Sequence, residues 1–168
     1  MSTMLTQDMR AVIRSASLCF AATVTPDGRP NVSPKGTIRV WDDTHLFFLD
    51  IASPGTRANL ASHPWMELNV VDQLSRRGYR FSGRAAVHEH DEIFEKATAM
   101  VLAGRRVNYP VRSVVLLEVE HATPLVSPGY WNVADESAMR AQWRERRSAL
   151  DTEFEAHLTT QGAFRVQK

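Results

Sequence analysis

The chain has 168 residues, of which 43% are hydrophobic and 23% are charged, as is typical of one domain with a core of ordinary size. Its 20 basic and 19 acidic side chains leave a net charge of +1, which excludes the strongly basic surface typical of nucleic-acid and anionic-membrane binders. The only cysteine, Cys19, excludes an internal disulfide and is typical of a reducing compartment. Residues 1–14 do not resemble a signal peptide, and no apolar run approaches the ~20 residues of a membrane span. We therefore expect a cytoplasmic protein.

The first predicted elements are a short helix and three strands. Apolar side chains recur on one helical face from Leu5 to Ala16, which predicts an amphipathic helix. The turn Pro26-Asp27-Gly28 and a second turn at residues 42–43 then separate three runs rich in β-forming residues. These runs cover residues 18–25, 31–41 and 45–51. Their short connections predict an antiparallel meander of three strands.

The middle of the chain predicts two helices among three further strands. One helix is expected from Arg57 to Ser62, because Pro64 disfavours helical backbone before it. The other is expected behind Asp91, an N-cap residue followed by an apolar stripe over residues 93–101. The strands are expected at residues 66–72, 79–90 and 113–119. The last contains four consecutive apolar residues, which indicates burial on both faces.

The C-terminal part predicts a long helix, capped by Asp135 and continuing to about residue 159. One face carries apolar residues and the other is strongly charged, so the helix is expected to dock on the sheet or on a second subunit. The complete prediction is a single domain, residues 1–168, with the C-terminal helix at about 135–160. Its class is mainly β with flanking helices, a six-stranded antiparallel barrel that is closed or nearly closed.

Several motifs that would identify a chemistry are absent. The sequence contains no G-x-G-x-x-G, no P-loop, no G-x-S-x-G and no C-x-x-C. His88 and His90 are two residues apart on a predicted strand, but their acidic neighbours favour a solvated strand end over a metal site. Cys19 lies between apolar residues, which favours core packing over nucleophilic chemistry.

Two segments, taken with their surroundings, indicate a family. They are Asn31-Val32-Ser33-Pro34-Lys35-Gly36 and Ser53-Pro54-Gly55-Thr56-Arg57-Ala58-Asn59-Leu60, the second followed by His63-Pro64. Residues 20–24 precede them and residues 79–85 follow. In this order and spacing the chain resembles the pyridoxamine 5′-phosphate oxidase-like family over about residues 9–126. The resemblance implies a split β-barrel that binds FMN and forms a homodimer.

The resemblance assigns the flavin phosphate to Ser53, Thr56 and Arg57, with Asn59 as an additional candidate. Elementary electrostatics agrees, because backbone N–H groups and the dipole at a helix N-terminus favour an anion and Arg57 can add charge-assisted bonds. The alternative is an ordinary helix cap with Arg57 facing solvent.

The resemblance also places Ser33, Pro34 and Lys35 along the flavin. Ser33 and Lys35 alternate on one strand face, from which the lysine can reach a phosphate or the polar edge of the ring. The alternative is an edge-strand lysine that discourages aggregation. The chain lacks the C-terminal Arg-Leu-x-Pro segment of the vitamin B6 oxidases, so oxidation of pyridoxamine phosphate is not expected.

The predicted function is an FMN-dependent oxidoreductase that moves electrons between a reduced nicotinamide donor and an unidentified small acceptor, without nucleic-acid or membrane partners. One alternative keeps the fold but binds the deazaflavin coenzyme or haem. Another is a flavin-binding or redox-sensing protein without enzymatic activity. Arg80 and Arg84 are expected to pair with nearby acids. Tyr130 and Trp131 either cover a ligand or pack against the last helix.

Overall fold

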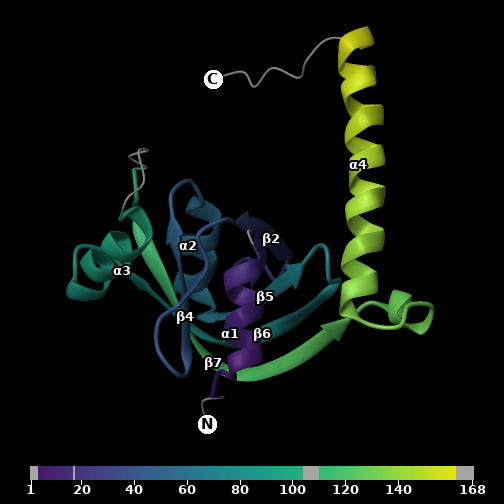
Figure 1. Ribbon diagram of the computed structural model, residues 1–168. Coiled ribbons are helices and arrows are strands. Elements are labelled where there is room, and N and C mark those ends of the chain that lie inside the picture. The colour runs from purple at the N-terminus through teal and green to yellow at the C-terminus, as the bar shows by residue number, and fades with distance from the viewer. Residues whose placement is uncertain (1–3, 17, 104–109, 162–168) are drawn as a thin grey trace. The chain divides into compact units, whose positions relative to one another are not determined.

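The polypeptide divides into two units, and the computed structural model describes residues 4–16, 18–103 and 110–161 (Figure 1). The first unit is formed by Met1–Asp72 and Arg77–Leu125 and carries almost the whole sheet. The second is formed by Gln73–Arg76 and Val126–Lys168 and carries the C-terminal helix. None of the described helices is both long enough and apolar enough to cross a membrane.

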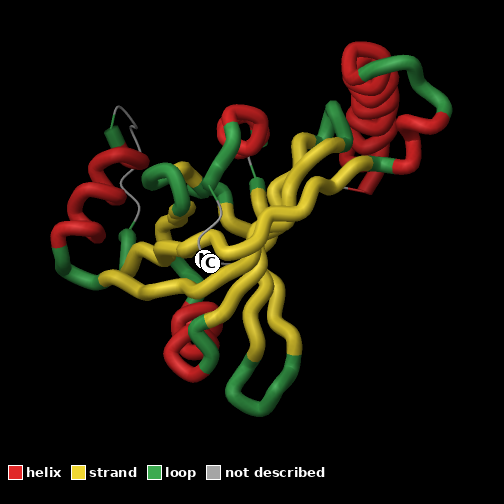
Figure 2. The backbone as a smooth tube through the Cα atoms, turned by 90° about the horizontal axis from the view of Figure 1, so that it is seen from below, coloured by secondary structure: helices red, strands yellow, loops and turns green. Residues whose placement is uncertain are grey.

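In the described residues seven strands form one sheet, in the order β2-β1-β5-β6-β7-β4-β3. Their bounds are β1 (Cys19–Val24), β2 (Pro30–Lys35), β3 (Arg39–Val40), β4 (His45–Asp50), β5 (Trp65–Asp72), β6 (Arg77–His88) and β7 (Ser113–Val126). The pairs β1–β2, β1–β5, β5–β6, β4–β7 and β3–β4 are antiparallel. Figure 2 shows the strands curling rather than lying flat. The predicted class, a mainly antiparallel split barrel with flanking helices, is confirmed.

The prediction of six strands and a three-stranded meander was wrong in one place. The expected strand over residues 31–41 is two strands, β2 and β3, separated at Gly36–Ile38. The hydroxyl of Thr37 accepts a hydrogen bond from the backbone N–H of Leu49 at 2.9 Å, so a side chain replaces a ladder partner at this point. As a result β2 pairs with β1, whereas β3 pairs with β4.

This break explains how the sheet closes. The edge strands β2 and β3 lie at opposite ends of the strand order, yet only residues 36–38 connect them. Four Cα–Cα steps span at most about 15 Å. The two ends of the sheet must therefore lie close together, as in a barrel that is split between its edges.

Three of the described helices belong to the first unit. They are α1 (Gln7–Ser15), α2 (Pro54–Ser62) and α3 (Glu92–Leu102). As predicted, α1 is amphipathic, and Asp91 caps α3 by accepting from the backbone N–H of Phe94 at 2.8 Å. The start of α2 was predicted three residues late, because Pro54 already has a suitable φ for the first helical position. α3 packs beside β4 (Figure 1).

The core of this unit has two parts, one on each side of β4 and β7. The larger includes Cys19 and the β7 residues Val115 and Leu117, together with the apolar face of α1. The smaller includes Val114 and packs under α3. Both faces of β7 are therefore buried, as its apolar run predicted, and Cys19 packs in the core as expected.

The second unit is built around α4 (Glu136–Gln161), which the cap Asp135 and the charge pattern predicted. A 3₁₀ turn, Pro128–Trp131, precedes it. Met139 is buried on α4, and the indole of Trp143 is stacked against the guanidinium of Arg76 at 4.1 Å. These contacts fix the first turns of α4 to the turn at residues 73–76.

Candidate functional site

Four of the predicted cofactor-binding residues meet around the ammonium of Lys35. Its Nζ donates hydrogen bonds to Ser33 Oγ and to Ser53 Oγ, both at 2.6 Å. The hydroxyls of Ser33 and Thr56 are 3.2 Å apart and share a further hydrogen bond. The same ammonium lies 5.4 Å from the ring centroid of Phe48. Residues separated by a hairpin in the sequence therefore form one hydrogen-bonded cluster.

The local structure explains how these side chains meet. Ser33 and Lys35 alternate on the inner face of β2, and Lys35 is only 5% exposed. Ser53 occupies the N-cap position of α2, but its hydroxyl caps no backbone N–H and accepts from Lys35 instead. Thr56 is buried one turn into the same helix. The strand thus supplies the cation, and the start of α2 supplies hydroxyls.

The environment of Lys35 perturbs its protonation. Burial lowers the pKa of the ammonium below its ordinary value, because the charged form loses solvation. The negative charge of Asp50 opposes this shift. Across the β1–β2 pair, Cys19 is the register partner of Lys35, and burial raises the pKa of its thiol to about 12. The thiol therefore stays neutral. Lys35 supplies the positive charge of the cluster.

Arg57 is placed differently from the prediction of a guanidinium free to face an anion. Its Nε lies 3.2 Å from Asp50 Oδ2, an ion pair whose geometry is not that of a hydrogen bond. Its Nη1 donates to Glu89 Oε1 at 2.9 Å. Two carboxylates therefore already face Arg57, and its assignment to the flavin phosphate stays a prediction.

Asn59 and Pro34 lie outside the lysine cluster. Asn59 is buried, and its amide donates to Thr23 Oγ1 at 2.9 Å, which joins α2 to β1. Pro34 is exposed on the outer face of β2, opposite to Ser33 and Lys35. The prediction that these two residues contact a cofactor stays untested.

Two functional candidates were missed by sequence reasoning. Asp50, fully buried at the end of β4, accepts from the backbone N–H of Ser53 at 2.8 Å and thereby orients the start of α2. Glu89 follows the end of β6 and meets Arg57. For Asp50 a signal existed, since it is a lone acid directly after the four consecutive apolar residues 46–49. For Glu89 no local signal distinguishes it from its acidic neighbours.

The charges of the whole site balance. Lys35 and Arg57 bring two positive charges, and Asp50 and Glu89 bring two negative ones. The donor set of one ammonium, three hydroxyls and one guanidinium is suited to phosphate oxygens, which accept charge-assisted hydrogen bonds. Because of this donor set, the residues present fit a phosphorylated cofactor.

Other polar residues that the sequence analysis singled out in the first unit pair with neighbouring side chains. Arg80 donates to Asn69 at 3.1 Å and lies 3.7 Å from Glu67, and Arg84 lies 3.9 Å from Glu120, so the expected pairing is confirmed. His88 bonds Asp91 at 2.7 Å, and β6 ends there, so His90 does not continue the strand face. Within the described residues, no group of three or more His, Cys, Asp or Glu is arranged to hold a metal ion.

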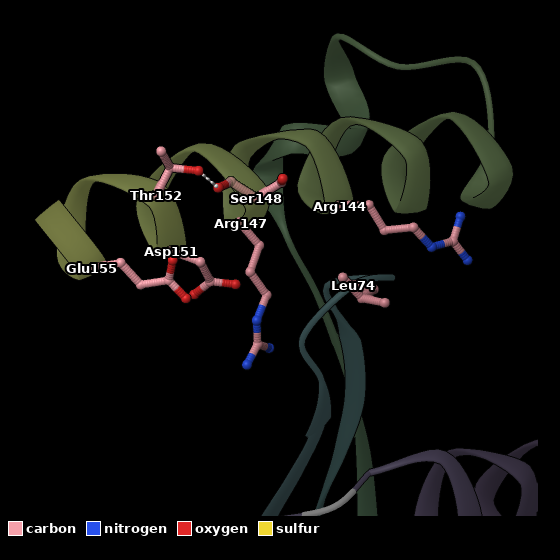
Figure 3. A pocket seen from close by; sticks show the side chains of 7 residues that line it. All are labelled: Leu74, Arg144, Arg147, Ser148, Asp151, Thr152 and Glu155. Atoms are coloured by element: carbon pink, nitrogen blue, oxygen red, sulfur yellow. Dashed lines mark hydrogen bonds between the residues drawn. The ribbon is translucent and has the colours of Figure 1, made fainter.

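The second unit has a groove of its own, between α4 and the turn at residues 73–76 (Figure 3). Leu74 faces side chains of α4 there, and Arg147 donates to Gln73 Oε1 at 3.0 Å. Tyr130 donates to the carbonyl of Ser75 at 2.6 Å, so its ring anchors this turn, whereas Trp131 is 86% exposed. None of the predicted cofactor-binding residues lines this groove.

Comparisons with known proteins agree with this fold. The family model for pyridoxamine 5′-phosphate oxidase matches residues 5–124. No curated protein matches the chain. The crystal structure of HupZ from Group A Streptococcus is similar, with a TM-score of 0.66 and 31% identity over 74% of this chain and 96% of HupZ. A Lactobacillus delbrueckii protein, provisionally assigned as a pyridoxamine 5′-phosphate oxidase, has a TM-score of 0.61 and 29% identity over 71% and 93% of the two chains. An FMN-binding protein from Syntrophomonas wolfei has a TM-score of 0.62 and 17% identity over 73% of this chain and 87% of its own. At this identity the similarity shows the fold alone.

Proposed function

Because the chain belongs to the pyridoxamine 5′-phosphate oxidase family, we propose that it binds FMN and transfers electrons from a reduced nicotinamide to a small acceptor. The observation that carries this proposal is the cluster of Lys35 with the hydroxyls of Ser33, Ser53 and Thr56. Burial of an ammonium among neutral hydroxyls is costly, which favours a role in binding an anion over a purely structural role for Lys35. A structural neighbour described as FMN-binding supports the choice of cofactor.

In this proposal the residues of the cluster bind and orient the phosphate. Lys35 supplies the charge, and the hydroxyls of Ser53 and Thr56 rotate from their present partners to donate to phosphate oxygens. The N-terminus of α2, with its free backbone N–H groups, adds a favourable dipole. When bound, FMN supplies the redox chemistry, and the protein supplies binding, orientation and electrostatics. We assign no residue of the site an acid–base role.

We also propose that the protein is a homodimer, supported by an apolar patch on the outer face of the sheet. Phe20, Val24, Val32 and Trp65 are large apolar side chains that remain 42–60% exposed on β1, β2 and β5. Register places Phe20 opposite Pro34 and Ala22 opposite Val32, so the patch is continuous across β1 and β2. Such a patch marks an interaction surface, and Pro34 and Val32 flank Ser33 on the same strand. A second copy on this face would lie next to the candidate site.

The dimer is tested by measuring the molar mass of the full chain by light scattering. We expect twice the chain mass of 18.9 kDa, and a shift towards the single-chain mass in Phe20→Glu. Met100→Glu, at an apolar side chain of equal exposure on α3 and outside the patch, is the matched control. A wild-type protein with the mass of one chain at micromolar concentration would refute the dimer.

The function is tested first by an absorbance titration of the purified chain with FMN, and then by oxidation of a reduced nicotinamide under anaerobic conditions. Shifted flavin bands and a stoichiometry of one FMN per chain would support the binding step, and flavin bleaching by the nicotinamide would support the transfer step. If the protein does not bind FMN, the proposal is refuted, and the same titration should be repeated with the deazaflavin coenzyme and with haem. Binding without bleaching would favour a non-enzymatic flavin-binding role.

A further inference from the structure

The two carboxylates that hold Arg57 are not equivalent. Asp50 is 0% exposed and is fixed by the backbone N–H of Ser53 at 2.8 Å, with the hydroxyl of Ser113 a further donor at 3.4 Å. Glu89 has a side chain that is 47% exposed, and among the described residues its carboxylate bonds only Arg57. Asp50 is therefore a permanent partner of the guanidinium, whereas Glu89 can leave at little cost.

Glu89 also occupies the side of Arg57 that faces an open groove. This groove lies between α2 and the end of β6, and its lining includes Arg57, Ala58, Ala85 and Glu89. Arg57 Nη1, the atom bonded to Glu89, is a donor that a ligand in the groove would meet, whereas Nε is buried beside Asp50. A second anion must compete with the Glu89 carboxylate for the charge and the donors of this nitrogen.

The backbone around Glu89 is built as a corner rather than as a continuing strand. β6 ends at His88, and His90 has a left-handed φ of 60°, which is uncommon for a residue with a side chain. Asp91 then begins α3 as its N-cap. Glu89 thus lies between two fixed elements and can swing its side chain without moving either one.

We propose that Glu89 is a displaceable counter-ion: it holds Arg57 when no phosphate is present, and yields the guanidinium to the phosphate group of the ligand. This inference rests on the proposed function, because it assigns the ligand phosphate to the same site. It makes Glu89 a determinant of selectivity, since a flavin with a phosphate must displace it and a flavin without one need not. With Glu89 released, the site offers two cations against the single buried carboxylate of Asp50.

The experiment compares Glu89→Gln with wild type. Glutamine keeps the length and the acceptor oxygen of the side chain but removes its charge. The matched control is Glu92→Gln, in the first turn of α3, which forms no ion pair with Arg57 in the structure. Dissociation constants for FMN and for riboflavin are measured by quenching of flavin fluorescence at low ionic strength.

We expect Glu89→Gln to bind FMN about three- to fivefold more tightly than wild type, as loss of competition from one partly exposed ion pair predicts. Riboflavin binding is expected to be unchanged in this variant, and Glu92→Gln is expected to bind both flavins as wild type does. An unchanged FMN constant, or equal tightening for riboflavin, would overturn the inference while leaving the FMN site intact.

A wild-type protein that binds neither flavin would instead refute the proposed function. The displacement then has its own test, with inorganic phosphate as the probe. Phosphate must raise the melting temperature of Glu89→Gln more than that of wild type and of Glu92→Gln. An equal rise in all three proteins would overturn the inference on its own terms.

Discussion

Replacing Lys35 with methionine separates the binding role of this residue from its packing role. Methionine is of similar length and is apolar, so it fills the space among Ser33, Ser53 and Phe48 without a charge. The hydroxyls left behind can bond one another, since Ser33 and Thr56 are already 3.2 Å apart. If Lys35 binds the phosphate, its loss should lower the affinity for FMN. If its burial costs stability, its loss should leave the unliganded protein equally stable or more stable.

The affinity for FMN should fall. A hydrogen bond to a charged group contributes about 1.5–3 kcal/mol. Since each 1.4 kcal/mol is a factor of ten, the dissociation constant should rise about 10- to 100-fold. Riboflavin, which lacks the phosphate, should lose much less.

The stability of the unliganded protein should stay the same or increase. Burial lowers the pKa of Lys35, so the folded state disfavours its charged form. At neutral pH the wild type bears this cost, and it is relieved as the pH rises through the folded pKa towards the ordinary value of 10.5. Between the folded pKa of Lys35 and 10.5, the unfolded chain binds more protons than the folded chain. The free energy of unfolding of the wild type should therefore rise relative to that of Lys35→Met as the pH increases. Cys19, whose pKa is raised, acts in the opposite direction but does so in both proteins.

Flavin fluorescence quenching measures the two affinities, and urea denaturation from pH 7 to pH 10 measures the two stabilities. Lys96→Met is the control, because Lys96 lies over the ring of Trp41 at 4.8 Å and away from the lysine cluster. Equal loss of FMN and riboflavin would show that Lys35 only shapes the pocket. Unchanged FMN affinity would refute its role in phosphate binding.

Two further predictions concern the barrel itself. Gly83→Ala should destabilise the protein by about 3 kcal/mol in urea denaturation, because a Cβ there would lie 1.9 Å from the backbone oxygen of Glu118. Gly55→Ala, whose Cβ would meet nothing within 4 Å, should change stability by less than about 1 kcal/mol, and equal effects would contradict the packing explanation. Cys19 is fully buried with a pKa of about 12, so a thiol reagent at pH 8 should react only after unfolding, and rapid labelling of the native protein would contradict its placement.

Periodicity predicted nearly every helix and strand, because most elements bury one face and the alternation of apolar residues reports that burial directly. The division of residues 31–41 was not predictable in this way. Gly36 and Thr37 lie outside the ladder, and the hydroxyl of Thr37 accepts from the backbone N–H of Leu49, 12 residues later in the chain. Local sequence carries no record of that partner.

The site followed the same logic. Ser33, Lys35, Ser53 and Thr56 could be predicted because the resemblance covered both motifs, and the structure brings all four together. Asp50 and Glu89 could not be assigned, since their importance depends on meeting Arg57. Glu89 is 32 residues away from Arg57 in the chain, and only the pairing of β6 within the sheet places the two side chains in contact.

The bond from Lys35 to Ser53 also has a mechanical consequence. Lys35 ends β2, at one margin of the sheet, and Ser53 follows β4, which neighbours the other margin. Among the described residues no ladder of backbone hydrogen bonds joins these margins, so side-chain hydrogen bonds such as those of Lys35 with Ser53 and of Ser33 with Thr56 fasten them where the barrel is split. A ligand held by both Lys35 and Ser53 would slow the opening of the gap. Binding should therefore slow amide exchange in β2 and β3 by a larger factor than it slows exchange in the central strands. Ligand binding and closure of the barrel are then thermodynamically coupled, so each can be measured through its effect on the other.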